Sequence, residues 1–187
     1  MHLLKLYFDY MREPEKALQS FLQQPSFTQA CAGYFVAALG WVLFFNTASG
    51  GTFPVLLLKL FFVFLAELTV GFVLAAFCGL FLDFLRIETS PAKLFALIGS
   101  SGIIKGLLIA FALIAAAVPE ARLKVLAPFA LLLVFLLQLG YLVRSLKRVY
   151  GVSYWKALGA WLFTGVPVLA VFGLLAVFTV WGIILVF

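Results

Sequence analysis

The sequence predicts an all-α membrane protein, a polytopic helical bundle with five transmembrane helices and a short amphipathic helix at its N-terminus. Two observations favour this fold class. The chain of 187 residues is 66% hydrophobic and only 11% charged, whereas a soluble domain is about half apolar and about a quarter charged. The apolar residues are also gathered in long runs that are separated by short polar connections. A water-soluble globule is therefore not expected.

Five apolar segments are long enough to cross the hydrocarbon core of a bilayer, which takes about 20 helical residues. They cover residues 27–45, 55–82, 91–118, 124–143 and 157–187. The connections between these segments are too short to hold a further folded unit. We therefore expect two parts, a cytoplasmic N-terminal segment over residues 1–26 and one transmembrane domain over residues 27–187.

The N-terminal segment is the one substantial polar stretch of the chain. Pro14 suits the first turn of a helix, because its missing N–H has no intrahelical partner there. Apolar residues follow it at helical spacing: Ala17, Leu18, Phe21 and Leu22. This pattern predicts an amphipathic helix over residues 15–24 that lies on the membrane surface. The segment has no uninterrupted apolar core, so a cleaved signal peptide is not expected.

The flanks of the predicted spans carry an uneven distribution of lysine and arginine, which sets the expected orientation. Nine of these cations fall on one side: Lys5, Arg12, Lys16, Arg86, Lys93, Arg144, Lys147, Arg148 and Lys156. Two fall on the other side: Arg122 and Lys124. Because cytoplasmic loops are enriched in these residues, the N-terminus is expected in the cytoplasm and the C-terminus outside.

Glu67 and Lys105 are the most informative residues, since each lies inside a predicted span. An ionisable side chain near the centre of the bilayer costs about 2.5–3.5 kcal/mol, so each is expected to have a partner or a task. Glu67 precedes Arg86 by 19 residues, and Lys105 follows Arg86 by 19. At about 1.5 Å per residue, the two reach the same depth in an antiparallel hairpin. The spacing predicts a buried intramembrane ion pair.

Small residues accompany both charges at the spacing that lets helices approach closely in lipid. They are Gly71, Ala75, Gly79, Gly102 and Gly106. Two interpretations stay open. The pair and the small residues could only fix the hairpin, which we favour, or the region could form a polar site for an ion, a proton or a lipid headgroup. Hydroxyl side chains that would serve such a site lie nearby: Thr69, Ser100 and Ser101.

The sequence contains no nucleophile–base pair, no metal-ligand cluster and no phosphate-binding glycine loop. An enzyme is therefore not expected, and neither is a cofactor or a metal. The +6 net charge is spread along the chain, so nucleic acid is not an expected partner. The expected partners are membrane lipids, other membrane proteins or further copies of the chain. The sequence identifies no small-molecule or ion ligand.

Two short motifs resemble the Yip1-domain family of five-span integral membrane proteins. The first is REPEKALQSFLQQP at residues 12–25, and the second is VYGVSYWKA at residues 149–157. The resemblance implies five spans, a cytoplasmic N-terminus and no catalytic residues. Eukaryotic members have a longer N-terminal region and act in vesicle traffic with small Rab GTPases. The short segment here is more similar to prokaryotic members, which implies the cytoplasmic (inner) membrane of a prokaryote.

The function expected from these features is a non-enzymatic multi-pass membrane protein that organises or binds membrane components. Two alternatives stay open. One is a small transporter or channel that uses the region around Glu67 and Lys105. The other is a lipid-handling protein such as a scramblase, in which a polar groove carries headgroups. An odd number of spans excludes a simple inverted repeat of two halves within one chain, which disfavours the transporter unless the chain dimerises.

Overall fold

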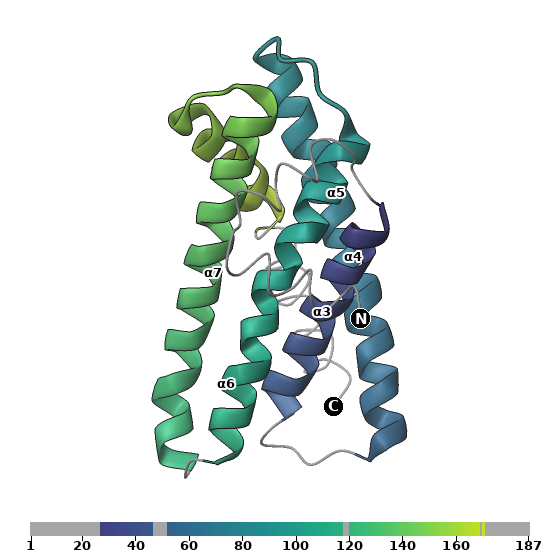
Figure 1. The fold of residues 1–187 in the computed structure, drawn as a ribbon, viewed down its shortest axis with the longest axis vertical. Helices are drawn as coiled ribbons and strands as arrows, with labels where there is room; N and C mark the ends of the chain where they lie inside the picture. Colours follow the sequence, from purple (N-terminus) through teal and green to yellow (C-terminus); the bar gives the residue numbers. More distant parts are fainter. Residues whose placement is uncertain (1–26, 47–51, 118–119, 169, 171–187) are drawn as a thin grey trace, which may run out of the picture.

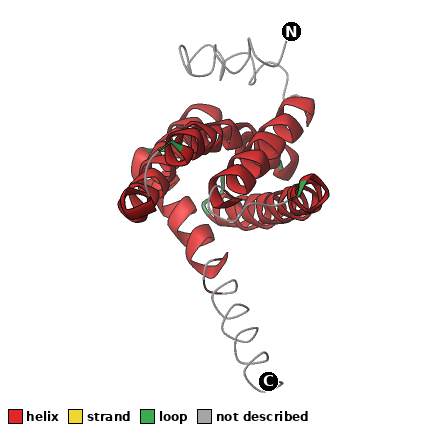
Figure 2. Cartoon of the chain, turned by 90° about the horizontal axis from the view of Figure 1, so that it is seen from below, coloured by secondary structure: helices red, strands yellow, loops and turns green. Residues whose placement is uncertain are grey.

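The computed structural model of the chain describes residues 27–46, 52–117, 120–168 and 170 (Figure 1). All regular structure in this part is helical, and it contains no strand. Four helical segments are long and apolar enough to cross a membrane: Phe27–Asn46, Phe53–Phe84, Pro91–Ala116 and Ala127–Tyr150. Figure 2 looks along the bundle and shows these segments nearly end-on. Their length and composition indicate an integral membrane protein.

Helix α3 (Phe27–Asn46) lies at the centre of the bundle and contacts α4, α5, η1 and α6. Its buried face consists largely of glycine and alanine, with Tyr34 as the largest fully buried side chain. Small side chains let neighbouring backbones come close, and close contact is the main source of helix association in lipid. This composition explains why α3 has so many neighbours.

Helix α4 (Phe53–Phe84) begins with a proline in its first turn and ends in a Schellman motif. The Ile87 amide donates to the Leu82 carbonyl at 3.0 Å, and the Arg86 amide donates to the Asp83 carbonyl at 2.8 Å. Arg86 has φ of 60°, the left-handed conformation that glycine usually supplies at this position. The turn after α4 therefore forms at a conformational cost, because a non-glycine residue adopts the left-handed conformation.

The third span is not one α-helix, which corrects the continuous helix expected over residues 91–118. It consists of α5 (Pro91–Ser101), a 3₁₀ segment η1 (Gly102–Gly106) and α6 (Leu107–Ala116). Glycine has the lowest α-helical propensity after proline, and η1 has one at each end. The span as a whole is still apolar enough to cross a membrane, so its average hydropathy does not reveal the change in hydrogen bonding.

Helix α7 (Glu120–Tyr150) continues past residue 143, where the fourth span was expected to end. Arg144, Lys147 and Arg148 mark the limit of the apolar surface, but arginine and lysine are good helix formers. The helix stops only before Gly151, whose φ is +65°. Residues 154–168 form the next helix, and the Ser153 hydroxyl accepts a hydrogen bond from the Lys156 amide at 3.4 Å.

Two predicted elements fall wholly or largely outside the described residues. The amphipathic helix over residues 15–24, with the rest of the N-terminal segment, is one of them. The other is the fifth span over residues 157–187, of which residues 157–168 and 170 are described and helical. The number of five spans therefore stays a prediction, as does the position of each terminus relative to the membrane.

The residues that the structure describes form two buried clusters of very different size. The larger one lies toward the α4–α5 turn and includes Tyr34, Leu82, Leu94, Leu97, Leu146 and Trp161. The smaller one joins α3, α6 and α7 and includes Phe44, Leu108, Ala112, Ala130 and Val134. Only 11% of the most apolar 18-residue stretch of α4 is buried inside the bundle, so much of this helix exposes apolar side chains. Inside a bilayer, such a surface faces lipid or another helix.

Candidate functional site

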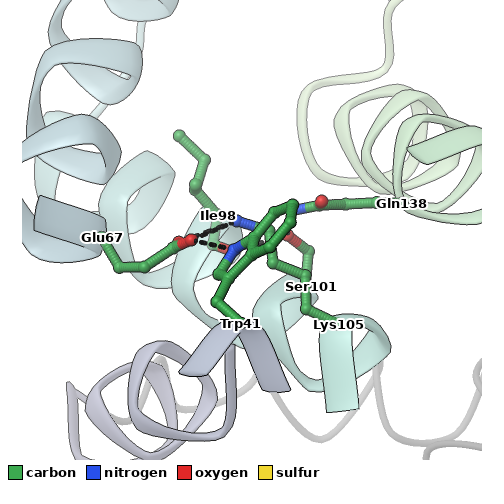
Figure 3. A network of polar contacts seen from close by, with 6 residues as sticks. All are labelled: Trp41, Glu67, Ile98, Ser101, Lys105 and Gln138. Atoms are coloured by element: carbon green, nitrogen blue, oxygen red, sulfur yellow. Dashed lines mark hydrogen bonds and ion pairs between the residues drawn. The ribbon is translucent and has the colours of Figure 1, made fainter. Parts of the chain in front are cut away.

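The structure brings Glu67 and Lys105 together in the middle of the bundle (Figure 3). The Lys105 ammonium lies 2.7 Å from Oε1 and 2.8 Å from Oε2 of Glu67. Glu67 comes from α4 and Lys105 from η1, which is the pairing across the hairpin that their equal spacing from Arg86 predicted. The side chains are only 13% and 15% exposed, respectively. Removing charges from water is costly, and this close two-oxygen contact offsets much of that cost.

Trp41 of α3 completes the contact. Its indole Nε1 donates a hydrogen bond of 2.7 Å to Oε1 of Glu67, and the Lys105 ammonium lies 5.7 Å from the centroid of its ring. The carboxylate thus accepts three charge-assisted hydrogen bonds from two other elements. Sequence reasoning missed Trp41. The available signal was its place within a span, because a buried indole N–H needs an acceptor.

A second polar contact connects the same region to α7. The Gln138 amide Nε2 donates to the Ser101 hydroxyl at 3.1 Å, and that hydroxyl donates to the Ile98 carbonyl at 2.6 Å (Figure 3). Ser100 and Thr69 donate to carbonyls of their own helices. The three hydroxyls named from the sequence therefore bond within the protein, and Thr69 is exposed on α4. None is paired with Glu67 or Lys105.

Some of the small residues predicted to pack the two helices of the hairpin against each other instead pack against α3. A Cβ atom at Gly71 would overlap the ring of Tyr34, and one at Gly102 would lie 2.6 Å from the Gly33 carbonyl oxygen. Both glycines therefore make room for α3. Gly79 faces Leu94 across the hairpin at ordinary contact distance. Ala75, in the larger buried cluster, and Gly106, at the end of η1, are also buried.

The closest backbone contacts use three glycines that sequence reasoning did not select. A Cβ atom at Gly33 would overlap the Gly99 carbonyl, and one at Gly40 would lie 2.5 Å from the Lys105 carbonyl oxygen. Helix α3 thus lies directly against the backbone of α5 and η1. The spacing Gly33, Ala37, Gly40 is a small-residue stripe that could have identified this face.

Two cavities that described residues line do not reach the charge pair. One of about 650 Å³ lies between α3, α4 and α5, with Asp83 as its charged residue. The other, of about 270 Å³, lies beside Trp41 near the ends of α3 and α4. Neither is lined by Glu67 or Lys105. Within the described part, no three His, Cys, Asp or Glu side chains gather as metal ligands, and both cysteines are free thiols.

The arrangement at the pair acts chemically as a closed contact. Both carboxylate oxygens have cationic or N–H partners from the protein, and the surrounding hydroxyls bond to carbonyls. Such a contact holds helices in register; to bind an ion or a proton carrier it would have to break one of its own bonds first.

Comparisons with family models, with curated proteins and with solved structures found no match to the chain.

Proposed function

We propose that this chain is a non-enzymatic multi-pass membrane protein of Yip1-like type, which organises or binds membrane components. The observation that carries the proposal is that Glu67 of α4 accepts its three hydrogen bonds from protein partners, Trp41 of α3 and Lys105 of η1. An intramembrane charge is by default a candidate for transport. Here the charge has a sufficient structural use, since its hydrogen bonds join α4 to η1 and to α3, and α3 packs against both.

The proposal includes five spans, an N-terminal surface helix over residues 15–24 and a cytoplasmic N-terminus. It places the protein in the cytoplasmic (inner) membrane of a prokaryote. The support is the distribution of lysine and arginine in the flanks and the resemblance of residues 12–25 and 149–157 to the family. Fusions of reporters to both termini test this part, and a cytoplasmic signal from a C-terminal fusion would contradict it.

Surface composition supports binding to membrane components. The exposed side of α4 carries large apolar side chains along its first half, among them Leu57, Leu58, Phe61 and Phe62. In a bilayer this surface contacts lipid, a partner helix or a second copy of the chain. An interface between helices in lipid would be expected to use small residues. The bulky side chains here favour lipid as the neighbour of this half.

Reconstitution into vesicles tests the proposal against transport. The purified full-length protein should give no proton or cation flux, and no lipid scrambling, above that of vesicles that carry the Glu67→Gln and Lys105→Met double variant. Circular dichroism of both preparations establishes that they hold folded protein. A flux that the double variant abolishes while it remains folded would contradict the proposal and make the pair a transport site.

One observation favours a second function, a small transporter or channel or a scramblase-like protein. The 3₁₀ segment η1 interrupts the third span at Lys105, with glycine at either end. Irregular helical backbone in the middle of a membrane segment is frequent at functional hinges and at substrate sites of transporters. The flux measurement above decides between the two functions, because only the second requires the charges for movement of a solute or a headgroup.

A further inference from the structure

We infer that the 650 Å³ groove between α3, α4 and α5 binds one acyl chain of a phospholipid whose headgroup carries a primary amine. This inference rests on the proposed role in binding membrane components and specifies the lipid. The groove runs along the second half of α4 from Phe72 to Asp83. Its volume is in the range of about 300–1,000 Å³ that is typical of small-molecule sites.

The shape of the groove follows from side-chain size. Ala75, Ala76 and Gly79 on α4 leave a shallow floor, and Ala92 does the same on α5. Phe27 and Phe95 form one wall, with ring centroids 5.8 Å apart. All of the lining residues except Asp83 are apolar or glycine. Their side chains cannot hydrogen-bond to water, but they can make dispersion contacts with a hydrocarbon chain.

The length of the groove identifies an acyl chain as the occupant. Phe72 and Asp83 are eleven residues apart on α4, which is about 16 Å along the helix axis. The hydrocarbon core of a bilayer is about 30 Å thick, so the groove extends through about one leaflet. A transmembrane helix of a partner would need a surface that continues through the other half. A lipid of the nearer leaflet has the length and the composition that the groove requires.

The charges at the end of the groove select the headgroup. Asp83 is exposed, and its Oδ1 accepts a hydrogen bond of 2.8 Å from the Thr89 hydroxyl. Oδ2 accepts no hydrogen bond from the described residues and can accept one from a primary ammonium group. Arg86 and Lys93 are exposed and lie within three residues of groove residues in sequence. They provide cations for the phosphate, so an ethanolamine-type headgroup matches both signs of charge.

Native mass spectrometry of the full-length protein tests this site with added phosphatidylethanolamine and phosphatidylglycerol of identical acyl chains. We expect the wild type to retain phosphatidylethanolamine more tightly. Asp83→Asn should reduce this preference about tenfold, which corresponds to about 1.4 kcal/mol. The matched control Glu88→Gln changes an exposed carboxylate in the same connection that does not line the groove, and it should leave the preference unchanged.

Filling the groove separates a specific site from lipid that surrounds the whole protein. Ala76→Phe places a ring in the groove and should remove the tightly held lipid of either headgroup. Ala66→Phe makes the same change at an exposed position of α4 outside the groove and should retain it. If Ala76→Phe and Ala66→Phe retain equal amounts of lipid, or if Asp83→Asn and Glu88→Gln behave alike, the inference is wrong. Vesicle flux tests the proposed function separately from either outcome.

Discussion

The two carboxylates of α4 have opposite surroundings. Glu67 lies within the bundle, 13% exposed, and both of its oxygens accept hydrogen bonds from Lys105 or Trp41. Asp83 lies sixteen residues later, about 24 Å along the helix, and is exposed with a hydrogen bond to the Thr89 hydroxyl at one oxygen. One helix thus carries one carboxylate with protein partners at both oxygens and one with a protein partner at a single oxygen.

The two carboxylates therefore differ in role: Glu67 stabilises the fold, whereas Asp83 is accessible to molecules around the protein. A charge deep in the membrane is tolerated when the protein supplies all of its partners, and those partners then tie neighbouring elements together. A charge near the interface can leave part of its hydrogen-bonding capacity to water or to a lipid headgroup at little cost. The intramembrane position of Glu67 is therefore weaker evidence for ligand binding than the open oxygen of Asp83 at the end of an apolar groove.

The largest effect is expected when the two carboxylates are neutralised separately. Glu67→Gln should lower the free energy of unfolding by about 3 kcal/mol or more, because Lys105 is left as a buried charge without its counter-ion. Asp83→Asn should change it by less than about 0.5 kcal/mol, as is usual for exposed positions. Reversible unfolding in mixed micelles, followed by circular dichroism, gives both values. Equal losses would remove the distinction between the two residues.

A substitution at Gly33 tests whether close contact of α3 is as important as the pair that it supports. Gly33→Ala should destabilise the protein by about 1–3 kcal/mol, since its Cβ atom meets the backbone carbonyl of Gly99 and cannot be avoided by a side-chain rotation. Gly140→Ala is the matched control, because nothing lies within 4 Å of a Cβ atom there. Thermal denaturation in detergent compares the two, and similar midpoints would mean that α3 does not pack as described.

The smallest effect concerns the turn that places Asp83 at the groove. Arg86→Gly should stabilise the protein by about 1 kcal/mol, because glycine adopts the left-handed conformation at this position without strain. Arg86→Ala removes the same charge but keeps a Cβ atom, so it should not stabilise. The midpoints of chemical unfolding measure both variants. If they stabilise equally, the effect comes from the charge and not from the backbone.

The sequence predicted the membrane class, the limits of the first two spans to within two residues and the juxtaposition of Glu67 with Lys105. These features depend on local hydropathy and on equal distances from one turn, which a linear pattern contains. The 3₁₀ segment, the continuation of α7 to Tyr150 and the contact of Gly33 with Gly99 were not predicted. The helix continues to Tyr150 because arginine and lysine are good helix formers, and η1 has a glycine at each end, neither of which hydropathy registers. The contact of Gly33 with Gly99 depends on how closely α3 approaches the hairpin, and a single sequence gives no measure of that distance.

The central claim is that Glu67 and Lys105 stabilise each other and have no further task, and a double-mutant cycle tests it most directly. Glu67→Gln keeps an amide oxygen for Trp41, so the cycle isolates the ion pair. We expect Glu67→Gln and Lys105→Met each to cost about 3 kcal/mol of unfolding free energy in mixed micelles. The double variant should lie within about 2 kcal/mol of the wild type. Losses that simply add in the double variant would contradict the claim.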